Sequence, residues 1–225
     1  MKQFAVAIDG PSGAGKSTIA KAVAAKLGCV YLDTGAIYRT VAVHMSIMGI
    51  SPKDRDGVTR LIDDVNIRIE FPGDGLQHMI LNGADVTGEL RTPEMSQAAS
   101  LISAYPCVRE VLLDLQRDFA KHNTVVMDGR DIGTVVLPNA EVKIFLTASP
   151  EVRARRRLNE LLEKGQKTTF REVLADVNRR DEQDSTREIA PLRCAQDAVR
   201  VDSSDCGIEE TVCRVLEIIR ERTNI

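Results

Sequence analysis

The sequence predicts an α/β protein in which an open parallel sheet is covered by helices on both faces and carries a small antiparallel insert. Short apolar runs with the character of buried strands alternate along the chain with longer helical patterns, which is typical of parallel sheets. Over about 64–90 the pattern changes to apolar–polar alternation, which indicates antiparallel strands. The length of 225 residues fits a single domain spanning 1–225.

The first elements enclose a glycine-rich loop. Residues 3–9 are mostly apolar and are followed by a glycine, so they predict a buried strand. The alanine-rich segment 16–27 predicts a helix that ends at Gly28. A second strand over 29–32 and a second helix over 36–48 follow.

The insert comes next. Residues 51–54 read Ser-Pro-Lys-Asp, a capping-box pattern with proline at the first helical position, so we expect a helix to begin there. Apolar residues alternate in 66–71, and 76–81 is a second strand candidate. Asn82-Gly83 is the strongest short hairpin signal, and a third strand is expected over 85–87.

The second half of the chain returns to alternating helices and strands. Strands are expected over 124–128, 142–147 and 199–201. Helices are expected over 93–103 and 106–122, from the N-caps Ser149 and Thr169, and over 208–222.

The composition argues against several classes of protein. The net charge of −3 disfavours a nucleic-acid partner, because nucleic-acid-binding domains are usually basic. The five cysteines show no C-x-x-C spacing, which indicates reduced thiols rather than disulfides or a zinc site. Asp9 interrupts the N-terminal apolar run, and no run reaches the ~18 residues of a membrane span. We therefore expect a cytoplasmic protein without a membrane partner.

The segment 8-IDGPSGAGKST-18 carries the clearest chemical signal. It contains G-x-x-x-x-G-K-[ST] between a predicted strand and a predicted helix, the context of a phosphate-binding loop. Glycines let backbone N–H groups and the positive end of the helix face one anion. Lys16 would bridge the β- and γ-phosphates of ATP, and Ser17 would ligate Mg²⁺. The expected ATP-binding residues are Gly10, Pro11, Ser12, Gly13, Ala14, Gly15, Lys16, Ser17 and Thr18.

Other classes that share this loop are disfavoured. The sequence has neither the N-K-x-D guanine-reading motif of GTPases nor the L-S-G-G-Q motif of transporter ATPases. Residues 54–57 have D-x-x-G spacing but do not follow a predicted strand. What remains is a small kinase that passes the γ-phosphoryl group to a second bound molecule.

An acceptor would bind beyond the carboxyl ends of the strands. There the segment 33–39 offers a hydroxyl at Thr34, an aromatic ring at Tyr38 and a phosphate-binding guanidinium at Arg39. The same residues would also be explained if Tyr38 packed in the core and Arg39 were solvated. This segment alone therefore does not distinguish an acceptor site from a structural role.

The segment 128-DGRDIG-133 ends another strand with charges of both signs. Asp128 would act on Mg²⁺ through a water, Arg130 would bind phosphate, and Asp131 would accept a hydrogen bond from an exocyclic amine. A turn with a surface ion pair is the alternative, and the clustering of charges favours a functional site.

Arginines are concentrated in 153–157 and 179–187. On a helix, Arg153, Arg156 and Arg157 would share a face, although charge runs are usually solvated. Phosphoryl transfer requires cations around three equatorial oxygens, and a segment that closes over ATP would supply them.

Together these motifs resemble bacterial cytidylate kinases, of the nucleoside-monophosphate kinase group. The resemblance spans nearly the whole chain and rests on IDGPSGAGKST, LDTGAIYR, the insert, GELRTPE, DGRDIGTVV, KIFLTAS, ARRR and the arginine–aspartate run before Ala190-Pro191. DTGAIYR and GRDIGTVV argue against adenylate, guanylate and shikimate kinases. Thr34 stands where members often have serine, and Ser17-Thr18 where some have Gly-Thr, and in both places the hydroxyl survives.

The resemblance implies transfer of the γ-phosphoryl group of ATP to CMP or dCMP in pyrimidine metabolism, with Mg²⁺ as cofactor and a monomeric protein. It implies a three-layer P-loop fold with a monophosphate-binding lobe over 35–105, its insert over about 64–90 and a short mobile lid over 150–167. The catalytic residues that it implies are Lys16, Arg130, Arg156 and Arg180.

The resemblance also assigns the acceptor site. Arg39 and Arg130 match positions that hold the CMP phosphate, and Thr34 and Tyr38 line the site. The positions that read cytosine are matched by Ser100, Arg109 and Asp131, and those that contact the sugar by Asp184 and Arg187.

Two alternatives stay open. One is a broader kinase that acts on both CMP and UMP, and the other is a non-catalytic nucleotide-binding regulator. Chemistry favours cytosine, because an ionised Asp131 accepts from the N4 amine of cytosine and repels O4 of uracil. The second arginine cluster disfavours the regulator, because a sensor of ATP alone needs no second phosphate site.

Overall fold

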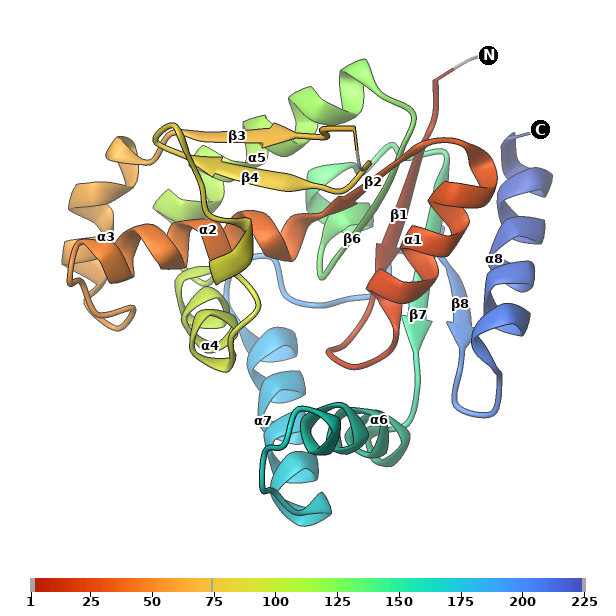
Figure 1. Cartoon of the computed structure of the whole chain (residues 1–225). Helices are drawn as coiled ribbons and strands as arrows, with labels where there is room; N and C mark the ends of the chain where they lie inside the picture. The colour runs from red at the N-terminus through yellow and green to blue at the C-terminus, as the bar shows by residue number, and fades with distance from the viewer. Residues whose placement is uncertain (1–2, 74, 224–225) are drawn as a thin grey trace. The chain divides into compact units, whose positions relative to one another are not determined.

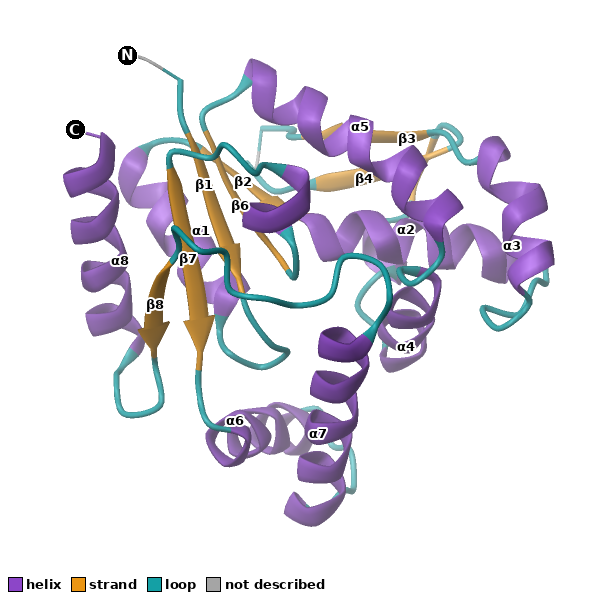
Figure 2. Ribbon diagram, turned by 180° about the vertical axis from the view of Figure 1, so that it is seen from behind, coloured by secondary structure: helices purple, strands orange, loops and turns teal. Residues whose placement is uncertain are grey.

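A computed structural model describes residues 3–73 and 75–223, and the chain divides into two compact units. Unit 1 comprises Met1–Tyr31 and Asn123–Ile225, and unit 2 comprises Leu32–His122. Figures 1 and 2 show the chain from opposite sides. A parallel sheet belongs to unit 1 and an antiparallel sheet to unit 2, which confirms the predicted combination of the two kinds of sheet.

The parallel sheet has the strand order β2-β6-β1-β7-β8. β1 pairs in parallel with both β6 and β7, and β7 pairs in parallel with β8. β2 begins in unit 1 and ends in unit 2. The five strands are β1 (Ala5–Asp9), β2 (Val30–Asp33), β6 (Val125–Gly129), β7 (Val142–Thr147) and β8 (Val199–Asp202).

Two helices of unit 1, α1 (Lys16–Leu27) and α8 (Ile208–Thr223), lie side by side against this sheet (Figures 1 and 2). Their apolar faces and the strands form one buried core. α1 begins and ends where the sequence predicts, because Gly28 adopts the left-handed conformation that closes a helix. The core members with 1% exposure or less include Val6, Ile8, Val23, Val126, Ile144, Leu146, Val201, Val215 and Ile219.

α6 (Pro150–Glu163) and α7 (Phe170–Thr186) pack on each other, beyond the carboxyl ends of β1 and β7 (Figure 1). A small cluster of Ala154, Val173 and Val177 is buried between them. Both predicted N-caps are confirmed. The Ser149 side chain accepts from the backbone N–H of Val152, and Thr169 and Glu172 form a reciprocal capping box.

Unit 2 contains helices and the small sheet. The sheet order is β3-β4-β5, with both pairings antiparallel. Asn82 and Gly83 have φ values of 49° and 90°, the conformation of a two-residue hairpin turn, so the predicted hairpin is confirmed. The elements are α2 (Thr34–Ile47), α3 (Arg55–Leu61), β3 (Ile67–Glu70), β4 (His78–Leu81), β5 (Ala84–Asp85), α4 (Pro93–Ile102) and α5 (Pro106–His122).

One predicted helix start is wrong. The sequence pattern places the start of α3 at Ser51, but the N-cap is Asp54, whose carboxylate accepts from the backbone N–H of Gly57 at 2.9 Å. The hydroxyl oxygen of Ser51 accepts from the N–H of Lys53, and its carbonyl oxygen accepts from the N–H of Asp54. Residues 51–54 therefore form a turn. An aspartate cap therefore prevails over the serine cap three residues earlier.

Among the described residues, no helix has both the length and the apolar character needed to cross a membrane.

Gly10, which follows β1, generates a prediction about the fold. A Cβ at this position would lie 1.9 Å from the carbonyl oxygen of Leu146, and the φ of 153° is unfavourable for other residues. Gly10→Ala should therefore lower the free energy of unfolding by more than about 1 kcal/mol. Gly88→Ala, at an exposed glycine with no atom within 4 Å of an added Cβ, is the control and should change it by less than about 0.5 kcal/mol. Urea denaturation followed by circular dichroism measures both, and equal effects would contradict the steric argument.

Candidate active site

The phosphate-loop motif joins the end of β1 to the start of α1. Gly13 and Gly15 have φ values of 77° and 89°, which glycine adopts without strain. Gly15 is the N-cap of α1 and has no side chain to bond the first N–H groups of the helix. The loop therefore turns backbone donors and the positive end of a helix toward one place, as an anion site requires.

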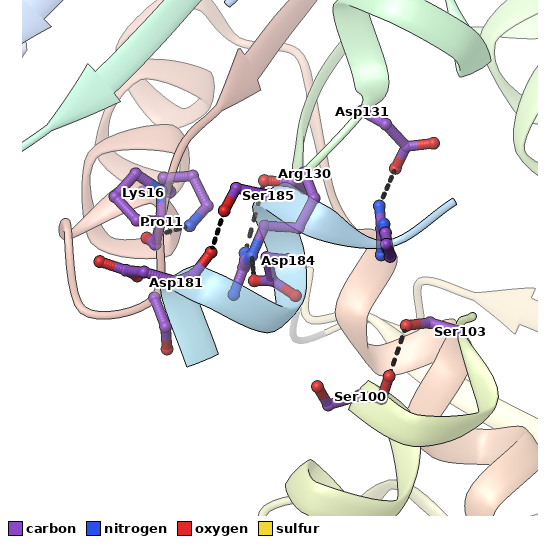
Figure 3. Close-up of polar contacts among 12 residues, drawn as sticks. Pro11, Lys16, Ser100, Ser103, Arg130, Asp131, Asp181, Asp184 and Ser185 are labelled. Carbon is purple, nitrogen blue, oxygen red and sulfur yellow. Dashed lines mark hydrogen bonds and ion pairs between the residues drawn. The ribbon is translucent and has the colours of Figure 1, made fainter. Parts of the chain in front are cut away.

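Lys16 lies over this loop. Its side chain is buried, and Nζ donates to the carbonyl oxygen of Pro11 at 2.8 Å (Figure 3). Burial and the charge of Arg130 lower the pKa of Lys16, while Asp128 and other nearby carboxylates oppose that shift. A bound polyphosphate would add negative charge and stabilise the charged ammonium.

Ser17 and Asp128, the two residues predicted to serve Mg²⁺, are in contact. The Ser17 hydroxyl donates to Oδ2 of Asp128 at 3.0 Å. The hydroxyl of Tyr31, on β2, donates to Oδ1 at 2.7 Å, so both carboxylate oxygens are held. A hydroxyl beside a carboxylate is the oxygen donor set that Mg²⁺ prefers, so these residues fit the ion. Tyr31 escapes sequence reasoning because only the pairing of distant strands brings it to Asp128.

The predicted residues Arg130 and Asp184 form an ion pair between the end of β6 and α7. Nε of Arg130 donates to Oδ2 of Asp184 at 2.7 Å (Figure 3). Burial opposes the charged form of Arg130, but the charge of Asp184 and its hydrogen bond outweigh burial and hold the pKa of Arg130 above its usual range. The guanidinium is therefore a permanent cation beside Lys16.

Asp131 and Arg187 form a second pair in the same unit. Nη2 of Arg187 lies 3.6 Å from Oδ1 of Asp131, and the two side chains are 8% and 6% exposed. Nε of Arg187 also donates to the carbonyl oxygen of Ala190 at 2.6 Å, which fixes the guanidinium after the end of α7. The structure thus brings together four of the predicted site residues, Arg130, Asp131, Asp184 and Arg187, in two ion pairs.

Asp9 is a buried carboxylate that the sequence identifies only as the end of a strand. It accepts hydrogen bonds from the backbone N–H groups of Ile132 and Gly133, both at 2.7 Å. Burial raises the pKa of Asp9 to about 6 although these two N–H groups oppose the shift. Its position within the motif Ile-Asp-Gly is the only signal available in the sequence.

The arginines of α6 have three different environments. Arg153 is buried and binds both oxygens of Asp181, at 2.9 and 2.5 Å, and its Nη1 donates to the carbonyl oxygen of Ser12 at 3.1 Å. Arg156 donates to the carbonyl oxygen of Ser203 at 2.6 Å, whereas Arg157 pairs with Glu160 at the surface. The three arginines, which were expected to share one face of the helix, therefore make three different contacts. Arg153 joins the phosphate loop to α7.

Arg180, the remaining predicted catalytic residue, lies on α7 one turn from Asp176. Its Nε is 2.9 Å from that carboxylate, which is 44% exposed. Ser185 and Asp181 of the same helix form an internal hydrogen bond of 2.6 Å (Figure 3). α7 thus presents the charges of Arg180, Asp181 and Asp184 from a single rigid element.

Unit 2 holds the predicted phosphate-binding Arg39. Its Nη2 donates to Oδ2 of Asp33 at 2.8 Å, while Oδ1 of Asp33 caps α2 by accepting from the N–H of Ala36 at 3.0 Å. Nε of Arg39 is buried and has no hydrogen-bond partner among residues 3–73 and 75–223. A Cβ at position 35 would lie 3.0 Å from both Arg39 and Asp33, which explains the glycine there.

Four more predicted site residues lie in unit 2. The guanidinium of Arg109, on α5, lies over the ring of Tyr38 at 5.7 Å, a cation–π contact. Nη1 of Arg109 donates to the carbonyl oxygen of Ser103 at 3.3 Å, and the Ser103 hydroxyl donates to the carbonyl oxygen of Ser100 (Figure 3). Thr34, the first residue of α2, is buried. The unit therefore holds a second group of polar and aromatic side chains.

Comparisons with known proteins show what this chain is similar to. A family model described as cytidylate kinase matches residues 6–221. The cytidylate kinase of Carboxydothermus hydrogenoformans is 52% identical over 220 residues, with 98% of this chain and 99% of that protein covered. The cytidylate kinase of Caldicellulosiruptor bescii is 49% identical over 218 residues, with 97% and 96% covered. The solved gluconokinase of Sinorhizobium meliloti 1021 has 16% identity, covers 99% and 97% of the two chains and has a TM-score of 0.49.

The Arg153–Asp181 pair generates a prediction of stability. The Arg153 side chain is 3% exposed and that of Asp181 29%, so Asp181→Ala leaves a buried guanidinium without its counter-ion. We expect a loss of about 2 kcal/mol in the free energy of unfolding, because breaking a buried pair costs more than breaking an exposed one. Glu160→Ala, which removes the exposed partner of Arg157, is the control and should cost less than about 1 kcal/mol. Equal losses in urea denaturation would contradict the role of this pair.

Proposed function

The chain belongs to the cytidylate kinase family, and we propose that it transfers the γ-phosphoryl group of ATP to CMP or dCMP, giving ADP and CDP or dCDP. One structural observation supports the proposal in addition to family membership. The phosphate loop of unit 1 lies beside a second cluster of buried and half-buried charges, in which Arg130 binds Asp184 and Arg187 binds Asp131. A protein that binds only ATP has no use for this second cluster.

In this proposal the backbone of residues 10–18 cradles the phosphates of ATP. Lys16 exchanges the carbonyl of Pro11 for phosphate oxygens, which is a small movement of a flexible side chain. Ser17 would hold Mg²⁺ directly and Asp128 would act through a water, while the Tyr31 hydroxyl keeps the Asp128 carboxylate in place. The ion, when bound, neutralises charge on the phosphate oxygens.

The proposed contacts to the acceptor nucleotide are those that the resemblance to cytidylate kinases assigns. Arg39 and Arg130 bind the phosphate of CMP, and each is already oriented by a carboxylate, Asp33 or Asp184. Thr34 and Tyr38 line the site. The proposed sugar contacts are Asp184 and Arg187, and the proposed readers of cytosine are Ser100, Arg109 and Asp131.

Base selection follows from charge. Asp131 forms an ion pair with Arg187, and a carboxylate accepts a hydrogen bond from the N4 amine of cytosine. Uracil presents O4, an acceptor, at the same place, and the two oxygens repel each other. A site built to bond a particular group rejects analogues that lack it.

Catalysis in this proposal is positioning and electrostatic stabilisation. Lys16, Arg130, Arg156 and Arg180 supply positive charge around the transferred phosphoryl group, whose oxygens accumulate negative charge. Residues 150–167 act as the lid and 35–105 as the monophosphate-binding lobe. The proposal includes a monomeric cytoplasmic enzyme whose partners are its small-molecule substrates, and not nucleic acid or a membrane.

A panel of nucleoside monophosphates tests the reaction. With Mg-ATP and a coupled assay of ADP release, CMP and dCMP should be phosphorylated well above UMP, AMP and GMP. Equal rates with CMP and UMP would favour the broader pyrimidine kinase, and no turnover with any acceptor would favour a regulator.

The same assay tests the base reader. Asp131→Ala should lower kcat/KM for CMP by about 100-fold or more, because the donor of cytosine loses its acceptor, while the Kd for Mg-ATP stays near that of the wild type. Asp118→Ala, an exposed aspartate on α5, is the control and should behave like the wild type. Retention of the preference for CMP over UMP in Asp131→Ala would show that another residue reads the base.

Lys16 is tested separately. Lys16→Ala should lower kcat by about 1000-fold, because the transferred phosphoryl group loses its nearest cation, with a native circular dichroism spectrum. Lys26→Ala, at an exposed lysine in the last turn of the same helix, should keep full activity. Substantial kcat in a folded Lys16→Ala protein would contradict the assignment.

A further inference from the structure

Asp131 precedes a short helix, η3 (Ile132–Val136), without capping it through its side chain. It occupies the N-cap position, where aspartate normally accepts a hydrogen bond from the first backbone N–H groups of the helix. Its carboxylate makes no such bond. Only its carbonyl oxygen serves the helix, accepting from the N–H groups of Val135 and Val136. The carboxylate lies instead near Arg187.

The missing cap is supplied by Asp9, from the end of β1. One carboxylate oxygen accepts from the N–H of Ile132 and the other from the N–H of Gly133, both at 2.7 Å. These are charge-assisted hydrogen bonds in a side chain that is 4% exposed, and such bonds are stronger than neutral ones. The first two donors of η3 are therefore satisfied by a residue more than a hundred positions away in the sequence.

The opposite side of the same turn is closely packed. A Cβ at Gly133 would lie 3.1 Å from Cδ of Lys143 and 3.3 Å from Oδ2 of Asp9. The Lys143 ammonium is itself fixed by the carbonyl oxygen of Pro138, at 2.5 Å, and by Asp197. The backbone that carries Asp131 is thus held between β1 and β7.

We propose that Asp9 is a positioning residue for base recognition. By capping η3 in place of Asp131, it leaves the Asp131 carboxylate oriented toward Arg187 and the acceptor base. Without the Asp9 carboxylate, the N–H groups of Ile132 and Gly133 lose a partner, and the Asp131 side chain, at the N-cap position, is placed to accept from the N–H of Gly133. Asp131 would then cap the helix and no longer read the base. This inference rests on the function proposed above.

Asp9→Asn tests the inference, because an amide retains one acceptor oxygen and turns its NH₂ group toward the other backbone donor. We expect the ratio of kcat/KM for CMP to that for UMP to fall about 10-fold or more, since a buried donor is left unsatisfied. The Kd for Mg-ATP should stay within about two-fold, which separates this role from a general effect on the adjacent phosphate loop. An unchanged CMP/UMP ratio in folded protein would overturn the inference.

A matched control uses another aspartate that caps a helix. The Asp54 carboxylate accepts from the N–H of Gly57 at 2.9 Å, and Asp54 lies outside both groups of proposed site residues. Asp54→Asn should leave the CMP/UMP ratio unchanged. A fall equal to that of Asp9→Asn would mean that any loss of helix capping has this effect, and would also overturn the inference.

A double-mutant cycle tests whether Asp9 acts through Asp131. If it does, Asp9→Asn should have little effect on the CMP/UMP ratio once Asp131→Asn is present, because coupled residues are not additive. Additive effects on the ratio would show that Asp9 acts by another route.

Two further outcomes keep the result interpretable. If Asp9→Asn does not fold, Gly133→Ala takes its place, because the added methyl group presses on Asp9 and on Lys143. A wild-type CMP/UMP ratio in that variant would overturn the inference. If the wild-type protein shows no preference for CMP, the proposed function itself is contradicted. If the wild type prefers CMP and Asp9→Asn keeps that preference, only the positioning role of Asp9 is contradicted.

Discussion

The position of β1 between β6 and β7 is the constraint on which the site of unit 1 depends. In the parallel register, Ile8 lies opposite Asp128 and Asp9 opposite Gly129 and Phe145. Carboxyl ends of parallel strands meet at one edge of a sheet, so the loop after β1 and the segment after β6 leave the sheet together. This register places Ser17 within reach of Asp128, and Asp9 within reach of the backbone after Asp131.

A second constraint is the attachment of α7 by buried or half-buried charges. Arg130 binds Asp184, and Arg153 binds Asp181, so the loop after β6 and the helix after β7 are both tied to α7. Such pairs contribute little net stability because desolvation offsets attraction, but they are costly to break singly. They therefore serve chiefly to fix where the arginines lie. A helix held this way presents Arg180 and Asp184 in a defined orientation.

The sequence predicts local features well and distant pairings poorly. The phosphate loop, the caps at Ser149 and Thr169 and the Asn82-Gly83 turn each depend on residues within a few positions, and the structure confirms their conformations. Arg130 and Asp131 are predicted from the charges that follow a strand, and Asp184 and Arg187 through the resemblance to a family. Their pairing is visible only in the ion pairs that join α7 and the residue after it to the segment after β6. No local motif reveals what Asp9, Tyr31 and Asp181 contact. Their roles arise from contacts across 97 to 124 positions for the first two, and between α6 and α7 for the third.

Asp33 and Asp131 both stand at the start of a helix, but their carboxylates make different contacts. Asp33 divides its carboxylate, with one oxygen capping α2 and the other holding Arg39. That arrangement suits a phosphate site, because the group that would bind phosphate is the guanidinium and the carboxylate only orients it. Asp131 is itself the proposed reader of the base, and a cap would occupy the oxygen that the base needs. Asp9 caps η3, so the Asp131 carboxylate is not used as the cap. In the proposed function this carboxylate discriminates between a donor and an acceptor on the pyrimidine ring.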